Sequence, residues 1–279
     1  MLRKESRQIN LSSQSATTYI NNSYLSYVEY SFPNFIRFDD NVSSISCGVQ
    51  NASIPVSYYT IDHRNMNLEY SFDGINKTIV TFNHGNYNAN TFKDEFERVT
   101  PFKVIFNKST GIYNFTHPTS NFYFHKENST CFRILGFNKN TSYESTFNIL
   151  YAPHLADLSG IRIIKIRSNT MVTNNADSNV GSYSGDICSI PITVGSYGII
   201  NYVNTNNFSS TLKNKHLSLF DIQILDEYDE LINFNNINWS ITLQFDIEYR
   251  EPLRFPMTLP LNNSKPKENI DEELKLLES

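Results

Sequence analysis

The sequence predicts an all-β protein, an antiparallel jelly-roll sandwich with two short helices. Segments with alternating apolar and polar residues recur along the chain, and aromatic residues, which suit pleated strands, make up 14% of it. The clearest alternating segments lie near opposite ends of the sequence, and a jelly roll pairs such distant strands within two facing sheets. Two forms remain open: a double jelly roll of two lobes, or one jelly roll with an insertion.

Residues 42–61 predict a strand, a bent edge and a second strand. Ile45, Cys47 and Val49 alternate with small or polar residues, which is the period of a strand with one buried face. Pro55 has no N–H to donate and favours an extended residue before it, so we expect a corner at that point. The six residues after Pro55 are again β-rich.

The first half of the chain also contains a series of shorter predicted strands. They cover residues 23–32, 67–72, 78–82, 102–106 and 112–116. The pair Asp73-Gly74 predicts a hairpin turn between the second and third of these strands.

Two short helices are predicted between these strands. Phe92 and Phe96 lie one turn apart within residues 91–99, with acidic residues near the start of the segment. A second helix is expected over residues 129–135 and ends at Gly136, a residue that suits a helix C-terminus.

In the second half, the β pattern lapses over residues 151–160, which predicts a lobe boundary or a crossing connection. Further strands are expected over residues 161–168, 187–194, 199–203, 217–225 and 239–249. Residues 174–185 predict a long loop. We expect residues 217–225 to turn at 226–229, to return through 231–234 and to lie opposite residues 239–249 in one antiparallel sheet.

The predicted domain organisation has four parts. An N-terminal arm covers residues 1–22, a first β-sandwich lobe residues 23–155, a second lobe residues 156–252, and an acidic C-terminal tail residues 253–279. The polar arm is expected to be ordered only where it lies on another surface.

Composition and charge exclude several classes of protein. A net charge of −5 argues against a dedicated nucleic-acid binder, so no direct nucleic-acid site is expected. No apolar run approaches the roughly 18 residues of a membrane helix, and the N-terminus lacks the apolar region of a signal peptide. We therefore expect a soluble protein without a transmembrane segment. Cys47, Cys131 and Cys188 are far apart and predict small buried side chains in a reducing compartment.

The sequence contains no phosphate-binding loop, dinucleotide fingerprint or zinc-protease motif, and we predict no catalytic, cofactor-binding or metal-binding residues. Residues 181–185, GSYSG, resemble a nucleophile elbow only superficially, because Tyr183 occupies the position of the serine.

Three clusters have a chemical interpretation and a structural one. His117 and His125 could meet on neighbouring strands as zinc ligands, but a structural or surface role is favoured. The acidic run 226–230 could hold calcium, although a solvated hairpin tip is favoured. Arg162, Lys165 and Arg167 could face nucleic acid or an acidic partner, whereas the favoured interpretation is that these charges lie on the solvent-exposed side of a strand and protect it from edge pairing.

Several segments together carry a recurring set of motifs. They are residues 41–61 (NVSSISCGVQNASIPVSYYTI), 63–72 (HRNMNLEYSF), 78–96 (TIVTFNHGNYNANTFKDEF), 133–137 (RILGF) and the closing segment 218–249. As a set they resemble minor capsid and penton proteins of nucleocytoplasmic large DNA viruses and of the related virophages and polinton-like viruses. Phe92 stands where leucine is commoner in that pattern.

The resemblance implies a jelly-roll component of a virion that is assembled in the cytoplasm of an infected host cell. The favoured role is the penton subunit, of which five copies close a vertex. Its expected partners are then its own copies, the major capsid protein and other minor capsid proteins. No enzyme activity and no cofactor are implied.

Three alternatives remain open. The chain could be an internal cement protein that joins capsomers, which differs from a penton in copy number per particle. It could be a carbohydrate-binding or receptor-binding β-sandwich that uses exposed tyrosines. It could also be a β-sandwich hydrolase whose site includes His117 and His125.

Overall fold

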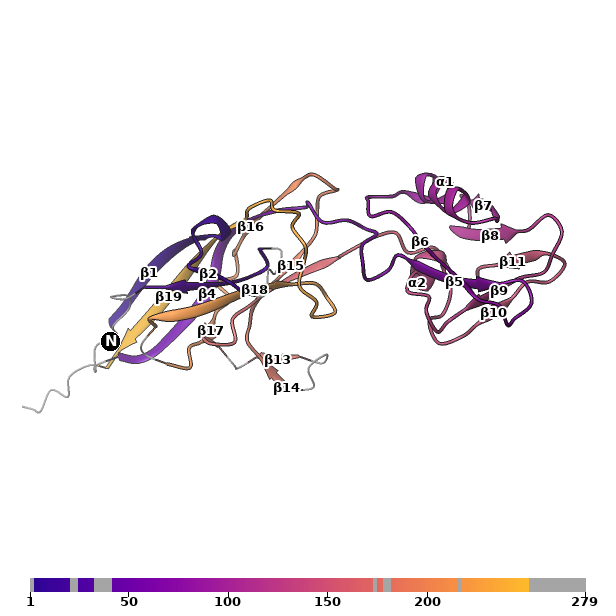
Figure 1. Ribbon diagram of the computed structural model, residues 1–279. Helices are drawn as coiled ribbons and strands as arrows, with labels where there is room; N and C mark the ends of the chain where they lie inside the picture. The colour runs from indigo at the N-terminus through magenta and orange to yellow at the C-terminus, as the bar shows by residue number, and fades with distance from the viewer. Residues whose placement is uncertain are drawn as a thin grey trace, which may run out of the picture.

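The computed structural model describes residues 3–20, 25–32, 42–172, 175–177, 182–214 and 217–250. Two lobes lie end to end and are joined by two segments of chain (Figure 1). One hydrophobic core contains residues from both ends of the described chain, and the other contains only residues between Ile61 and Ala152. The smaller lobe is therefore an insertion into the larger one.

The first sheet of the larger lobe consists of five antiparallel strands. In spatial order they are β1 (Arg3–Ser12), β19 (Ser240–Tyr249), β4 (Val42–Pro55) and β16 (Ile199–Val203), with β17 (Ser210–Thr211) also paired to β4. Strand β1 pairs with β19 from Arg3 opposite Tyr249 to Ser12 opposite Ser240. The two ends of the described chain are thus adjacent strands.

The second sheet faces the first across the core. Its order is β15 (Asp186–Pro191), β12 (Ile163–Arg167), β18 (Leu219–Leu225), β3 (Tyr27–Ser31) and β2 (Thr18–Tyr19). Buried side chains from both sheets, such as Phe245 on β19 and Phe220 on β18, fill the space between them. A 3-10 turn, η1 (Ser13–Ser15), leads from β1 towards β2.

The strand order is that of a jelly roll. Its eight main strands follow the chain as β1, β3, β4, β12, β15, β16, β18 and β19. The first sheet holds the first, eighth, third and sixth of them in that order, and the second holds the second, seventh, fourth and fifth. The all-β jelly-roll prediction is confirmed, in the form of one jelly roll whose third and fourth strands are separated by the insertion lobe.

The insertion lobe contains two small sheets and two helices. One sheet has the order β10 (Tyr143–Glu144), β9 (Tyr123–His125), β5 (Asn67–Ser71), β6 (Thr78–Thr81), and the other β11 (Ile149–Tyr151), β8 (Ile112–Thr116), β7 (Lys103–Asn107). The helices are α1 (Ala89–Val99), which Asn88 caps, and α2 (Phe132–Leu135), which ends at Gly136 with a φ of +83°. Its core is mostly aromatic, with Phe96, Phe115 and Phe124 in mutual ring contact.

The predicted domain boundaries differ from this arrangement. Residues 3–12 are not an arm but β1, because they pair along the whole length of β19. The division into lobes 23–155 and 156–252 is wrong, because β3 and β4 belong to the same sandwich as β12 to β19. The predicted tail, residues 253–279, lies outside the described residues.

Three local predictions also need correction. The β-rich residues 56–61 link the lobes and contribute only an isolated bridge between Ile61 and Gly85. Strands β18 and β19 belong to different sheets, so residues 217–234 do not lie opposite β19 in one antiparallel sheet. The predicted loop 174–185 contains the paired strands β13 (Asn175–Asp177) and β14 (Ser182–Ser184).

Candidate functional site

The two segments that join the lobes lie against each other at the junction. Gly160, in the returning segment, has a φ of +67°, and a Cβ atom there would lie 3.0 Å from Thr60 Cγ2 in the outgoing segment. The backbone N–H of Thr60 donates to Asn86 Oδ1 at 3.0 Å. Glycine therefore permits both the backbone conformation and the close approach of the two segments.

The corner after β4 is bound to the segment that follows β18. Ser57 Oγ donates to the carbonyl of Phe234 at 2.7 Å, and Asn235 Nδ2 donates to the carbonyl of Ser57 at 2.6 Å. Pro55 is the last residue of β4, as its missing N–H predicts. These two side-chain hydrogen bonds therefore fix the direction in which the chain leaves the sheet after β4.

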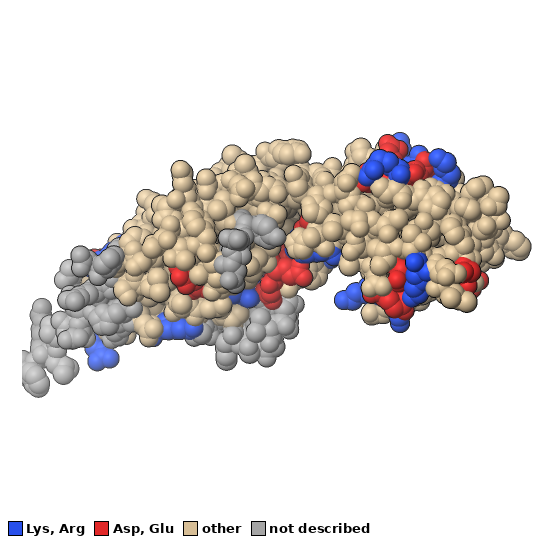
Figure 2. All heavy atoms as spheres, viewed as in Figure 1, with Lys and Arg blue, Asp and Glu red and all other residues tan. Residues whose placement is uncertain are grey.

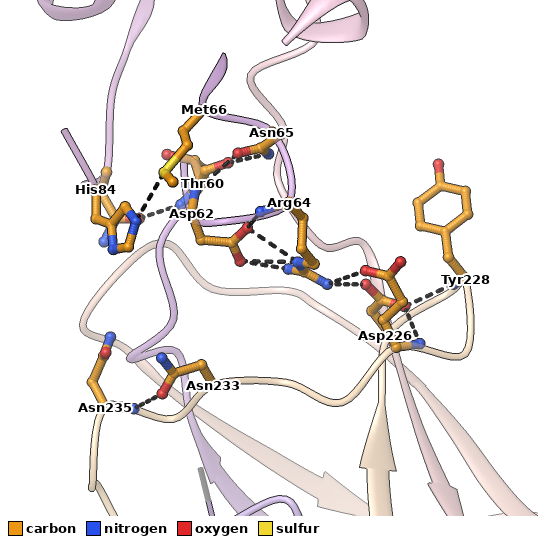
Figure 3. A network of polar contacts seen from close by, with 12 residues as sticks. Thr60, Asp62, Arg64, Asn65, Met66, His84, Asp226, Tyr228, Asn233 and Asn235 are labelled. Carbon is orange, nitrogen blue, oxygen red and sulfur yellow. Dashed lines mark hydrogen bonds and ion pairs between the residues drawn. The ribbon is translucent and has the colours of Figure 1, made fainter. Parts of the chain in front are cut away.

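Arg64 forms the centre of an ionic network between the lobes (Figure 3). Its guanidinium contacts Asp62 at 2.8 Å and Asp226 at 2.5 Å, and reaches Glu230 at 3.2 Å. Asp62 lies at the start of the insertion, whereas Asp226 follows β18 of the jelly roll, and both carboxylates are buried. Despite the burial of Arg64, its contacts with Asp62 and Asp226 raise its pKa, so it remains charged.

The acidic hairpin, residues 226–230, also contacts both lobes through other residues. Tyr228 lies under the guanidinium of Arg133 from α2, 5.0 Å from the ring centroid. Arg133 in turn contacts Asp157 at 2.9 Å, and Arg162 contacts Glu227 at 3.4 Å. The hairpin is therefore a bridge between the lobes.

The prediction of a solvated hairpin tip holds for Tyr228 and Glu230, which are exposed, and is wrong for Asp226. Asp226 is buried, and its Oδ1 accepts the backbone N–H groups of Tyr228 and Glu230 at 2.8 and 3.0 Å. Because arginine and lysine side chains approach these carboxylates, the run resembles an ion-pair cluster more than a calcium site. No group of His, Cys, Asp or Glu residues in the described part of the chain is arranged to hold a metal ion.

The interpretation of Arg162, Lys165 and Arg167 as protection of a wet strand face is also wrong for the last two. Their strand, β12, lies between β15 and β18 and is not an edge. Arg167 contacts Asp186 and Asp229 at 2.6 Å each, and Lys165 contacts Asp229 at 3.0 Å. These cations neutralise acidic groups of the same chain.

His117 and His125 have separate environments. The ring of His117 packs at a tilt against that of Phe72, with centroids 4.7 Å apart, and Nδ1 accepts the backbone N–H of Ser120 at 3.1 Å. His125 is buried, and its Nε2 lies 2.7 Å from Ser71 Oγ. Both rings therefore take part in structural contacts of the insertion lobe.

We expect the pH dependence of stability to depend on His125. Burial lowers the pKa of His125 below its ordinary value of 6.5. The unfolded chain therefore binds a proton first, and the stability that His125 contributes above pH 6.5 is lost as the pH falls through its lower folded pKa. Urea unfolding between pH 7.5 and 5 should show a shallower pH dependence for His125→Gln. Equal slopes for the two proteins would contradict this assignment.

The three cysteines are free and buried, as predicted. Burial raises the pKa of the Cys47 and Cys131 thiols, which keeps them protonated and unreactive.

The GSYSG motif of residues 181–185 is only partly described. Gly181 and the side chain of Tyr183 lie outside the described residues. In the described part, neither helix combines the length and the apolar character needed to cross a membrane.

The outer face of the first sheet is polar and its side chains bond to one another. Thr242 donates to Asn10 at 2.8 Å, and Gln8 contacts Gln244 at 3.2 Å. Strand β16, at the edge of this sheet, differs because Ile199 and Val203 are exposed.

Figure 2 shows that charged residues on the visible face gather over α1, on the opposite side of the insertion lobe and near the junction.

Comparisons with known proteins give structural matches only. No protein-family model and no curated protein matches the chain. A crystal structure of selenomethionine-labelled mavirus penton protein matches with a TM-score of 0.46 and 11% identity, over 87% of this chain and 100% of that one. A cryo-EM structure of the Sputnik virophage matches with a TM-score of 0.40 and 12% identity, over 88% of this chain and 98% of that one. The jelly-roll assignment rests on the strand order of this chain itself.

Proposed function

We propose that this chain is a structural, non-enzymatic subunit of an icosahedral viral capsid, the penton, and that five copies of it close each vertex. This proposal rests on the positions that the capsid-like motifs occupy in the fold. Residues 41–61 and 218–249 supply β4, β18, β19 and the bridge to the insertion lobe. The motifs thus build the jelly roll and set the direction in which the insertion leaves it.

A ring of five subunits needs two different surfaces on each copy, because head-to-tail contacts are heterologous. Among the described strands, β1 lies at one edge of the first sheet and β16 at the other. The exposed Ile199 and Val203 give the β16 edge an apolar character that suits a subunit interface. Other surfaces would contact the major capsid protein and other minor capsid proteins in the particle, which would assemble in the cytoplasm of an infected cell.

The oligomeric state tests this proposal. The purified protein should form a pentamer of about 161 kDa, five times the chain mass of 32.2 kDa, in native mass spectrometry. The variant Ile199→Lys/Val203→Lys should remain monomeric, because an interface cannot accept two unpaired charges without a large desolvation cost. Its far-ultraviolet circular dichroism spectrum should match that of the parent, since both side chains are exposed and their replacement leaves the fold unchanged.

A matched control places the same charges elsewhere. Ile105→Lys/Tyr151→Lys changes two exposed residues of the insertion lobe, on β7 and β11, and should leave the pentamer intact. A strictly monomeric parent protein under these conditions would contradict the vertex role. Equal loss of the pentamer in both double variants would contradict the assignment of the β16 edge.

A further inference from the structure

The two lobes share no apolar core. Within the described part of the chain, the hydrophobic cluster of the jelly roll and that of the insertion lobe have no buried residue in common. The lobes are joined by two segments, residues 56–61 and 152–162, and by the polar contacts of the acidic hairpin (Figure 1). Domains are expected to move relative to one another unless a large hydrophobic interface fixes them. The junction therefore has the composition of a hinge.

Open space flanks the joining segments in two places. One cavity, of about 460 Å³, lies between Lys139 in the turn after α2 and the acidic hairpin, and we call it the junction groove. A second cavity, of about 410 Å³, lies between residues 86–88 of the insertion lobe and residues 194–197 of the jelly roll. Thr60 and Gly160, at which the two joining segments approach each other, line both cavities. The lobes therefore have room to tilt about this point.

Opposite charges line the junction groove from the two lobes. Lys139 lines it from the insertion lobe, is exposed, and has no hydrogen bond or ion pair with any described residue. Glu230 lines it from the acidic hairpin, and its side chain is 56% exposed. Among the described residues, only Oε2 of this carboxylate has a partner, the guanidinium of Arg64 at 3.2 Å. The other oxygen of Glu230 is available to a second cation.

The other carboxylates of the junction groove are already engaged. Each has an arginine partner within 3.4 Å and a less exposed side chain than Glu230, and they are Asp157, Asp226 and Glu227. Glu230 is therefore the carboxylate most available to Lys139. The two residues form no ion pair in the groove as it stands, and a narrowing of the groove would bring their charges together.

We propose that the junction is a hinge with an open and a closed position, and that an ion pair between Lys139 and Glu230 holds the closed one. The structure shows the open position. We expect the buried contact of Arg64 with Asp226 to persist in both positions. Because the Lys139 pair is exposed to solvent, it should shift the balance towards closure by up to about fivefold at low ionic strength and by less in high salt. The hinge is a property of each single chain and goes beyond the structural role proposed above.

Zero-length cross-linking of the full-length protein tests the contact. A carbodiimide joins a lysine amine to a carboxylate in direct contact through an amide bond, and takes up the water that is lost as a urea. Peptide mass spectrometry should detect a Lys139–Glu230 cross-link that is about three- to fivefold less abundant at about 500 mM than at about 50 mM NaCl. The internal standard is the cross-link between Lys77 and Glu127, which are 3.1 Å apart within the insertion lobe. A mixture of isotopically labelled and unlabelled protein identifies products between copies.

Energy transfer between dyes on the two lobes tests whether the lobes themselves move. Ile105→Cys and Phe208→Cys place one exposed label on each lobe, and the three native cysteines are buried. With labelled protein diluted into unlabelled protein, the transfer efficiency should shift between the two salt concentrations. Lys139→Glu, which repels Glu230, should give the high-salt value at both. Lys126→Glu makes the same charge change at another exposed lysine of the insertion lobe and should behave as the parent does.

Three results would each overturn the inference. They are absence of the Lys139–Glu230 cross-link, a yield that does not respond to salt relative to the standard, and a transfer efficiency that is the same at both salt concentrations. Both measurements report on contacts within one copy, so they do not depend on the oligomeric state. A protein that is monomeric but shows the salt-dependent closure would contradict the vertex role and leave the hinge intact.

Discussion

Replacement of Arg64 by alanine is expected to lower the free energy of unfolding by about 3 kcal/mol. The guanidinium contacts Asp62 and Asp226, whose carboxylates are both buried and come from different lobes. Without it, two negative charges remain close together and poorly solvated, which costs far more than the loss of a surface ion pair. Urea denaturation followed by fluorescence at pH 7 measures the difference.

Two further variants make this result specific. Lys103 also contacts a glutamate, Glu97, at 3.2 Å, but its side chain is largely exposed and Glu97 is not buried, so Lys103→Ala should cost much less than Arg64→Ala. Arg64→Lys keeps the charge but loses the planar fork that reaches both lobes, and should fall between the parent and Arg64→Ala. Equal losses for Arg64→Ala and Lys103→Ala would show that the network does not hold the lobes together.

Replacement of Trp239 by alanine is expected to lower the free energy of unfolding by about 4 kcal/mol. Trp239 precedes β19, is 1% exposed and belongs to the jelly-roll core. Its Nε1 donates to the carbonyl of Leu25 at 2.8 Å, so the indole also fixes the segment before β3. Truncation therefore leaves a large cavity and an unpaired carbonyl.

Trp239→Phe separates the two contributions. The phenyl ring retains much of the packing and loses the hydrogen bond, so the loss should be roughly 1 to 2 kcal/mol. Denaturant unfolding of the three proteins checks the order. If Trp239→Ala unfolded at the same urea concentration as the parent, the residue could not be a core anchor of the sandwich.

The alternation of residues predicted the strands well but not their partners. The expected strand over 239–249 matches β19, Ser240–Tyr249, because one of its faces meets the core along its whole length. The same pattern in β18 suggested that it pairs with β19 in one sheet, yet the two strands belong to opposite sheets of the sandwich. A period of two residues shows which side is buried, but strands that pair and strands that face across a core both bury one side.

The insertion was difficult to recognise for a similar reason. The return to the jelly roll coincides with the lapse of pattern over residues 151–160, whereas the departure at residues 56–61 looks like a continued strand. Local patterns cannot show that β4 and β12, separated by more than a hundred residues, belong to one sandwich. Residues 1–22 were expected to form an arm because they are polar, but the outer positions of β1 are polar side chains that bond to those of β19.

The junction was largely missed because its members are far apart in sequence. Asp62 and Arg64 are separated from Asp226 by about 160 residues, and no local spacing connects them. A signal was present in the balance of charges, because the acidic run 226–230 and the cations Arg162, Lys165 and Arg167 occur in one otherwise weakly charged region. If the acidic run and these cations are taken as partners of each other, and not as two separate surface clusters, the sequence predicts the ion pairs that the structure contains.

Electron cryomicroscopy of purified virus particles tests the central proposal most directly. Density for the jelly roll and its insertion lobe should lie at the five-fold vertices, with five copies around each axis and the β16 edge of one copy against its neighbour. Density for this chain beneath hexameric capsomers would instead identify a cement protein. Either that position, or particles that lack the chain altogether, would contradict the penton assignment.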